Sequence, residues 1–185
     1  QKNAYTIQET IEKVLYKIYK KEIKTIVAGR TDAGVHALKN YFNFHIEKSD
    51  IPIEKIPFVM NSYLSKSIRI LETSEQAENF NSRFNAKKRI YEYYIEYGKI
   101  NPFLRNYRLF YQKKLNFEKM NAGAELLLGT HNFNGFRASD CGAKNPERTV
   151  YESYFELRNN TLVYHISANA FLKNMVRIIM GTLIQ

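Results

Sequence analysis

The sequence predicts an α+β fold of two domains, residues 1–80 and 81–185, in which helices cover mostly antiparallel sheets. Segments with apolar residues at helical spacing are interspersed with segments in which apolar and polar residues alternate. Residues 75–85 are polar and show neither helical spacing nor alternation of apolar residues, so they are the predicted domain boundary. A chain of 185 residues is long enough for two small domains.

The first domain is predicted to run helix, strand, turn, strand, helix, strand. The first helix is indicated by Ile7, Ile11 and Val14, which recur at helical spacing between charged residues. Pro57 lies awkwardly inside the second helix, because proline interrupts helical hydrogen bonding. The predicted elements are a helix at 5–20, strands at 23–28 and 41–46, a helix at 53–64 and a strand at 68–71.

The second domain is predicted to open with a strand at 89–97 that is rich in aromatic residues. Its alternation places Tyr91, Tyr93, Ile95 and Tyr97 on one face of a sheet. The closing helix is predicted to expose Lys173 and Arg177 on one stripe. The remaining predicted elements are a helix at 117–127 ended by Gly129, strands at 150–157 and 162–168 joined by a hairpin at 158–160, and the closing helix at 171–183.

Composition excludes several classes of protein. With 44% apolar residues, including 14 Tyr and 12 Phe, the chain can bury a core, which argues against disorder. There is no apolar run long enough to span a bilayer and no signal-peptide core at the N-terminus. The single cysteine, Cys141, predicts neither an internal disulfide nor a structural zinc site, so we expect a cytoplasmic protein.

The formal net charge of +10 favours a polyanionic partner, because neutralising phosphates releases their condensed counterions. Solubility alone is the alternative explanation for this charge. The most unusual segment is residues 29–37, GRTDAGVHA, which places Asp32 in a turn directly after a predicted strand. Arg30 can lie on the same side and lower the carboxylate pKa, which suits a nucleophile. The alternatives are an ordinary turn in which Gly34 supplies a positive φ, and a packed or surface role for His36.

This segment resembles the signature of the TruA family of tRNA pseudouridine synthases, and further motifs follow in the family's order. Two segments depart from the family pattern: LSKSI at 64–68 replaces Leu-Pro-x-Asp-Ile, and FNSR at 80–83 replaces Phe-His-Ala-Arg. The matching motifs are GRTDAGVHA at 29–37, RFNA at 83–86, RIYEY at 89–93, GTHNF at 129–133, FRA at 136–138 and FLKNMVR at 171–177.

The resemblance implies that Asp32 is the catalytic nucleophile, Arg30 its basic neighbour and Tyr91 a stacking surface for the target base. A base stacked on an aromatic ring gains about 1–3 kcal/mol, although sheet packing is the alternative role of Tyr91. Lys173 and Arg177 are the candidate phosphate ligands, with solvated helix charges as the alternative.

The resemblance further implies the pseudouridine synthase fold, a homodimer that binds tRNA across both subunits, and isomerisation of uridine in the anticodon stem–loop without cofactor or metal. The sequence does not distinguish between attack by Asp32 at C6 of the base and attack at C1′ of the ribose. The family's first strand, with its Tyr-Asp-Gly segment, and its last strand are expected to lie outside this chain. The rival hypothesis is a basic RNA-binding module without catalysis. That module leaves the Arg-Thr-Asp turn unexplained, because a carboxylate repels phosphate.

Overall fold

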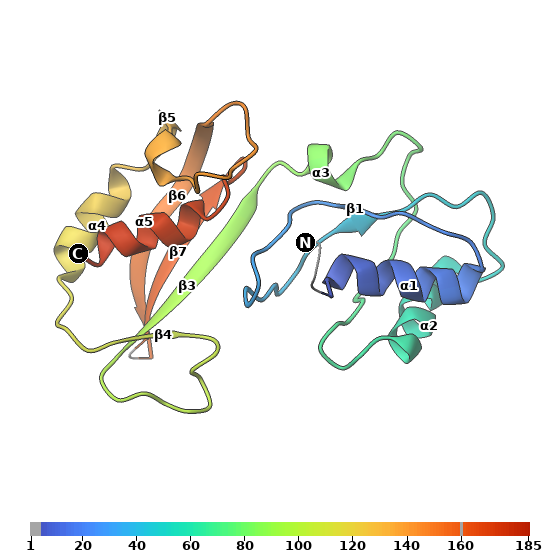
Figure 1. Cartoon of the computed structure of the whole chain (residues 1–185), viewed down its shortest axis with the longest axis horizontal. Coiled ribbons are helices and arrows are strands. Elements are labelled where there is room, and N and C mark those ends of the chain that lie inside the picture. The colour runs from blue at the N-terminus through green and yellow to red at the C-terminus, as the bar shows by residue number, and fades with distance from the viewer. Residues whose placement is uncertain (1–4, 160) are drawn as a thin grey trace. The chain divides into compact units, whose positions relative to one another are not determined.

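The computed structural model describes residues 5–159 and 161–185 (Figure 1). Backbone proximity divides the chain into two compact units. The first comprises the described part of Gln1–Thr31 together with His36–Ala86, and the second comprises Asp32–Val35 and Lys87–Gln185. The boundary expected after residue 80 stays a prediction.

The first unit combines helices with a small antiparallel sheet. Helix α1 begins where the Thr6 hydroxyl accepts a hydrogen bond from the backbone N–H of Glu9, and it ends at Lys20, which has a left-handed φ of 57°. The elements of this unit are α1 (Ile7–Tyr19), β1 (Ile26–Val27), β2 (Phe42–Asn43), the 3₁₀ helix η1 (Ile53–Lys55), α2 (Ile56–Tyr63) and α3 (Ser82–Asn85).

The core of the first unit forms between α1 and α2. The apolar stripe predicted for α1 is confirmed at Ile11, Val14 and Leu15, which are buried, whereas the predicted member Ile7 is exposed. Together with residues of α2 and the neighbouring loops they form one hydrophobic cluster: Ile11, Val14, Leu15, Ile23, Ile56, Met60 and Ile70.

Two predictions for this unit need correction. The strand predicted at 68–71 is wrong, since the side-chain amide of Asn61 exchanges two 2.8 Å hydrogen bonds with the backbone N–H and carbonyl of Ile70 and so takes the place of a neighbouring strand. Pro57 lies in the first turn of α2, which begins at Ile56, and not in a helix interior, so it interrupts no helical hydrogen bond. The predicted strands at 23–28 and 41–46 shorten to β1 and β2.

The second unit is a five-stranded sheet with the strand order β4-β3-β7-β6-β5. Neighbouring strands are antiparallel except β3 and β4, so the mostly antiparallel sheet is confirmed. Figure 1 shows α4 and α5 lying along this sheet. The elements are β3 (Arg89–Tyr97), β4 (Leu109–Tyr111), α4 (Phe117–Glu125), β5 (Gly129–Asn132), the 3₁₀ helix η2 (Asn134–Phe136), β6 (Glu147–Arg158), β7 (Thr161–Ala168) and α5 (Met175–Leu183).

One face of this sheet and the two helices enclose the second core. Tyr164 at its centre is fully buried, and its hydroxyl shares a 2.8 Å hydrogen bond with the Ser153 hydroxyl. Burial raises the pKa of Tyr164 to about 12. The principal side chains of this core are Ile95, Phe155, Tyr164 and Ile166 from the strands, and Met120, Ala124, Met175, Ile179 and Met180 from the helices.

The opposite face carries charged side chains. The His165 ring lies between Glu92 and Glu152, with Nε2 3.5 Å from Oε2 of Glu152. Glu152 also contacts Lys88 and the Ser167 hydroxyl, and Arg158 contacts both Glu92 and Glu156. Hydrogen bonds from Lys88 and Ser167 lower the pKa of Glu152 to about 2.

Several boundaries in this unit differ from those predicted. Strand 89–97 is confirmed as β3, whereas β4 and β5 have no counterpart among the predicted elements. Gly129 begins β5 rather than ending a helix, because α4 stops at Glu125. The closing helix begins at Met175, since Asn174 has a left-handed φ of 61°. Arg158 pairs with Thr161 as a hairpin requires, and the predicted connection includes Asn160, which lies outside the described residues.

Candidate active site

The segment Asp32–Val35 forms the tight turn that carries the predicted nucleophile. The backbone N–H of Val35 donates to the carbonyl oxygen of Asp32 at 3.1 Å, and Gly34 has a φ of 83°. The prediction that Gly34 supplies a positive φ is therefore confirmed. The Asp32 side chain is 36% exposed, so its carboxylate can be reached by a substrate.

The guanidinium beside Asp32 belongs to Arg177 on α5. Its Nη1 lies 3.8 Å from Oδ2 of Asp32, and its side chain is 63% exposed. Because α5 buries Met175 and Ile179, Arg177 lies on the helix surface, as the sequence predicts. The sequence favours Arg30 as this neighbour. Arg30 is exposed and belongs to the first unit, so its pairing with Asp32 stays a prediction.

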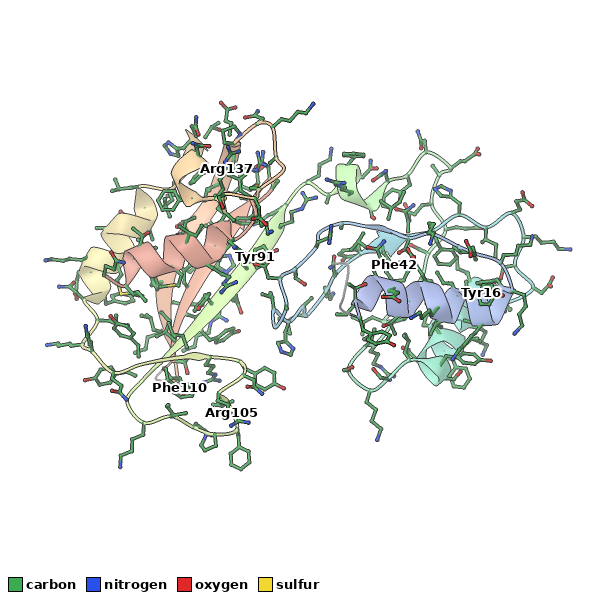
Figure 2. All side chains as sticks on the ribbon, in the orientation of Figure 1. Tyr16, Phe42, Tyr91, Arg105, Phe110 and Arg137 are labelled. Atoms are coloured by element: carbon green, nitrogen blue, oxygen red, sulfur yellow. The ribbon has the colours of Figure 1, made fainter. Side chains whose placement is uncertain are left out.

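Tyr91 lies on β3 (Figure 2), on the face of the sheet that packs against the core. Its ring meets the ring of Phe171 edge-on, with centroids 5.0 Å apart and an interplanar angle of 89°. Burial, and then the negative charge of Asp32, raise the pKa of the Tyr91 hydroxyl. The structure therefore brings Tyr91 and Asp32 into one electrostatic environment, with part of the Tyr91 side chain still exposed.

Lys173 is not on the stripe predicted with Arg177, because it precedes the left-handed residue Asn174 and the start of α5. Its ammonium pairs with the Asp140 carboxylate instead. Arg137 (Figure 2) donates to the carbonyl oxygen of Ala143 at 3.0 Å, in the same loop as Asp140.

The side chains able to bind metal ions are dispersed in the part of the chain that the structure describes. In residues 5–159 and 161–185, no set of three or more His, Cys, Asp or Glu side chains is arranged to hold a metal ion. Within the same residues, none of the helices is long and apolar enough to cross a membrane. The site thus offers the accessible carboxylate of Asp32, an adjacent guanidinium and an aromatic ring, and the Lys173–Asp140 pair lies in the same unit.

Comparison with known proteins identifies the family. A family model described as "tRNA pseudouridine synthase" matches residues 1–85 and 124–185. The tRNA pseudouridine synthase A of Thermoanaerobacter pseudethanolicus is 41% identical over 184 residues, which cover 99% of this chain and 75% of that protein. The protein of the same name from Caldicellulosiruptor bescii is 39% identical over 185 residues, covering 100% and 75%. That of Buchnera aphidicola is 41% identical over 186 residues, covering 100% and 70%. The chain belongs to the tRNA pseudouridine synthase family.

Proposed function

We propose that this protein isomerises uridine to pseudouridine in the anticodon stem–loop of tRNA, with Asp32 as the nucleophile. The observation that carries the proposal is the accessible Asp32 carboxylate in a turn, 3.8 Å from the Arg177 guanidinium and close enough to Tyr91 to affect its hydroxyl. A purely structural turn needs neither a cation nor an aromatic ring beside its carboxylate.

The reaction begins when the target base leaves its stack, since Asp32 cannot reach a base within a helix. The exposed part of Tyr91 offers the extruded base a flat surface, and stacking of this kind contributes about 1–3 kcal/mol. The contact with Phe171 restricts rotation of the Tyr91 ring, which prepares that surface before the base arrives.

A carboxylate oxygen of Asp32 then bonds to C6 of uracil or to C1′ of the ribose, and the N1–C1′ bond breaks. The uracil turns over, C5 bonds to C1′, and the bond to Asp32 breaks. The proton lost from C5 is balanced by one taken up at N1, so the product is an isomer of the substrate. Neither electrons nor phosphoryl groups are transferred, so we expect no cofactor or metal.

Two roles are proposed for the basic side chains. Arg177 attracts the Asp32 carboxylate across 3.8 Å and offsets its charge near the RNA backbone. Arg177, Lys173 and Arg30 are the proposed phosphate ligands, in agreement with the formal net charge of +10. A homodimer that binds tRNA across both subunits in the cytoplasm completes the proposal.

Release of tritium from tRNA labelled at C5 of uridine tests the proposal, with the full-length protein in excess over tRNA. Release in parallel with pseudouridine formation supports it. Tight binding of tRNA without any release supports the rival, a basic RNA-binding module, and overturns the assignment of catalysis.

A further inference from the structure

The Lys173–Asp140 pair belongs to the same unit as Asp32 and Arg177, and the reaction does not use it. Lys173 is the nearest cation to Arg177 along the chain, yet its ammonium contacts Asp140. Both side chains are open to solvent, 46% exposed for Lys173 and 68% for Asp140. An exposed ion pair is weak, because water and salt screen it. A phosphate can therefore compete with Asp140 for this lysine.

The backbone around the pair is fixed, which keeps the two side chains together. The N–H of Ala138 donates to the carbonyl oxygen of Lys173 at 3.0 Å, and the N–H of Cys141 donates to that of Ala138 at 3.0 Å. The N–H groups of Ala143 and Lys173 both donate to the Cys141 sulfur, which lowers the pKa of that thiol. Asp140 is thus held at Lys173 by backbone contacts on either side of it.

We propose that Asp140 masks Lys173, so that an RNA phosphate must displace the Asp140 carboxylate before it can bind the ammonium. This inference rests on the proposed tRNA-binding function and assigns Asp140 a positioning role that acts through Lys173. The hydrogen bond and charge of Lys173 lower the pKa of Asp140, so the masking carboxylate is ionised at neutral pH.

Masking has a consequence for salt dependence. A lysine that binds a phosphate releases condensed counterions, which steepens the fall of affinity with salt. Masking opposes part of this fall, because salt screens the Lys173–Asp140 pair and makes Lys173 easier to free as the salt concentration rises. Lys173 therefore contributes less to the salt slope in the parent protein than it does once the charge of Asp140 is removed.

The test measures binding of tRNA and of polyuridylate across a salt series. Asp140→Asn is expected to steepen the log–log slope by at most about 0.7, the full contribution of a single phosphate bound on a single strand. It is also expected to raise affinity between about 1.5-fold and fivefold, the range that follows from the free energy of an exposed ion pair. Asp140→Glu, which keeps the charge, is expected to restore the parent slope.

Two further variants separate masking from other effects of the charge change. In a Lys173→Ala background, Asp140→Asn should leave the slope unchanged, because no lysine is then released. Glu156→Gln removes a carboxylate from an ion pair with Arg158 on the opposite face of the sheet, and should also leave the slope at the parent value.

An unchanged slope in Asp140→Asn overturns the inference, as does an equal steepening in the Lys173→Ala background. A fall in melting temperature with an unaltered slope would show that Asp140 only fastens its loop. Because polyuridylate binding requires no catalysis, the masking result stands apart from the tritium-release result on which the proposed function depends.

Discussion

Replacing Asp32 with asparagine separates a chemical role of this side chain from a structural one. Asp32→Asn keeps the size of the side chain and leaves the turn intact, because the 3.1 Å hydrogen bond from Val35 ends on the backbone carbonyl of residue 32. Asparagine suits turns as well as aspartate does. What the substitution removes is the charge and the attacking oxygen.

The structure limits the cost in stability. The ion pair of Asp32 with Arg177 spans 3.8 Å and is partly exposed, so its interaction in water is worth about 1 kcal/mol at most. A loss of that size lowers the melting temperature by about 4 °C or less in a chain of this length. Binding of tRNA should be kept or slightly strengthened, since a negative charge near phosphate is gone.

Turnover, by contrast, should fall to background in a single-turnover tritium-release assay, in which product release cannot hide the chemical step. Asp50→Asn is the matched control, an exposed aspartate in the first unit for which we expect parent activity. The protein must be fresh and its mass verified, because deamidation of the new side chain regenerates aspartate. Conversion at near the parent rate by verified Asp32→Asn would refute the nucleophile assignment.

Four further predictions concern binding, the aromatic ring, the basic neighbour and acid stability. Filter binding of tRNA should weaken steeply with salt because of the +10 charge, and a flat response would remove the electrostatic argument. Tyr91→Ala should slow turnover roughly tenfold to a hundredfold through lost stacking. The control Tyr93→Ala should lower the melting temperature without slowing turnover. A large fall in the melting temperature of Tyr91→Ala with turnover at the parent rate would contradict the stacking role. Arg30→Ala should slow single-turnover conversion without abolishing it, and an unchanged rate argues against Arg30 as a substrate ligand. Because the pKa of Glu152 is lowered from 4.5 to about 2, its ionised form stabilises the fold above pH 4.5, and this stabilisation is lost as the pH falls toward 2. In Glu152→Gln, the free energy of unfolding should therefore depend less on pH between 4.5 and 2.

The fold can be predicted where the sequence carries a long periodic pattern. The bounds predicted for strand 89–97 are those of β3, because alternation over nine residues gives a clear strand pattern. Strands of three or four residues, such as β4 and β5, hold too few residues to show a period. The false strand at 68–71 has a different cause. Its apolar pattern is real, but the amide of Asn61 satisfies the backbone of Ile70, and no pattern within the segment reveals that.

The candidate site shows the same division between local and long-range information. The turn at Asp32 follows from local chemistry, because Gly34 tolerates a positive φ that other residues avoid. The proximity of Arg177 to Asp32 depends on how α5 packs in the second unit, and residues so far apart in sequence carry no local signal of it. The pairing of Asp140 with Lys173 could not be predicted from the sequence for the same reason. The one local signal is that Asp140 is the single acidic residue between the basic residues Arg137 and Lys144.

The left-handed residue Asn174 separates two basic side chains that have different partners. Lys173 precedes this residue and faces Asp140, whereas Arg177 follows it and faces Asp32. A substitution at position 140 therefore alters the first cation without turning the helix that carries the second. On the roles proposed for these residues, affinity for RNA can change through position 140 while Asp32 and Arg177 keep their arrangement.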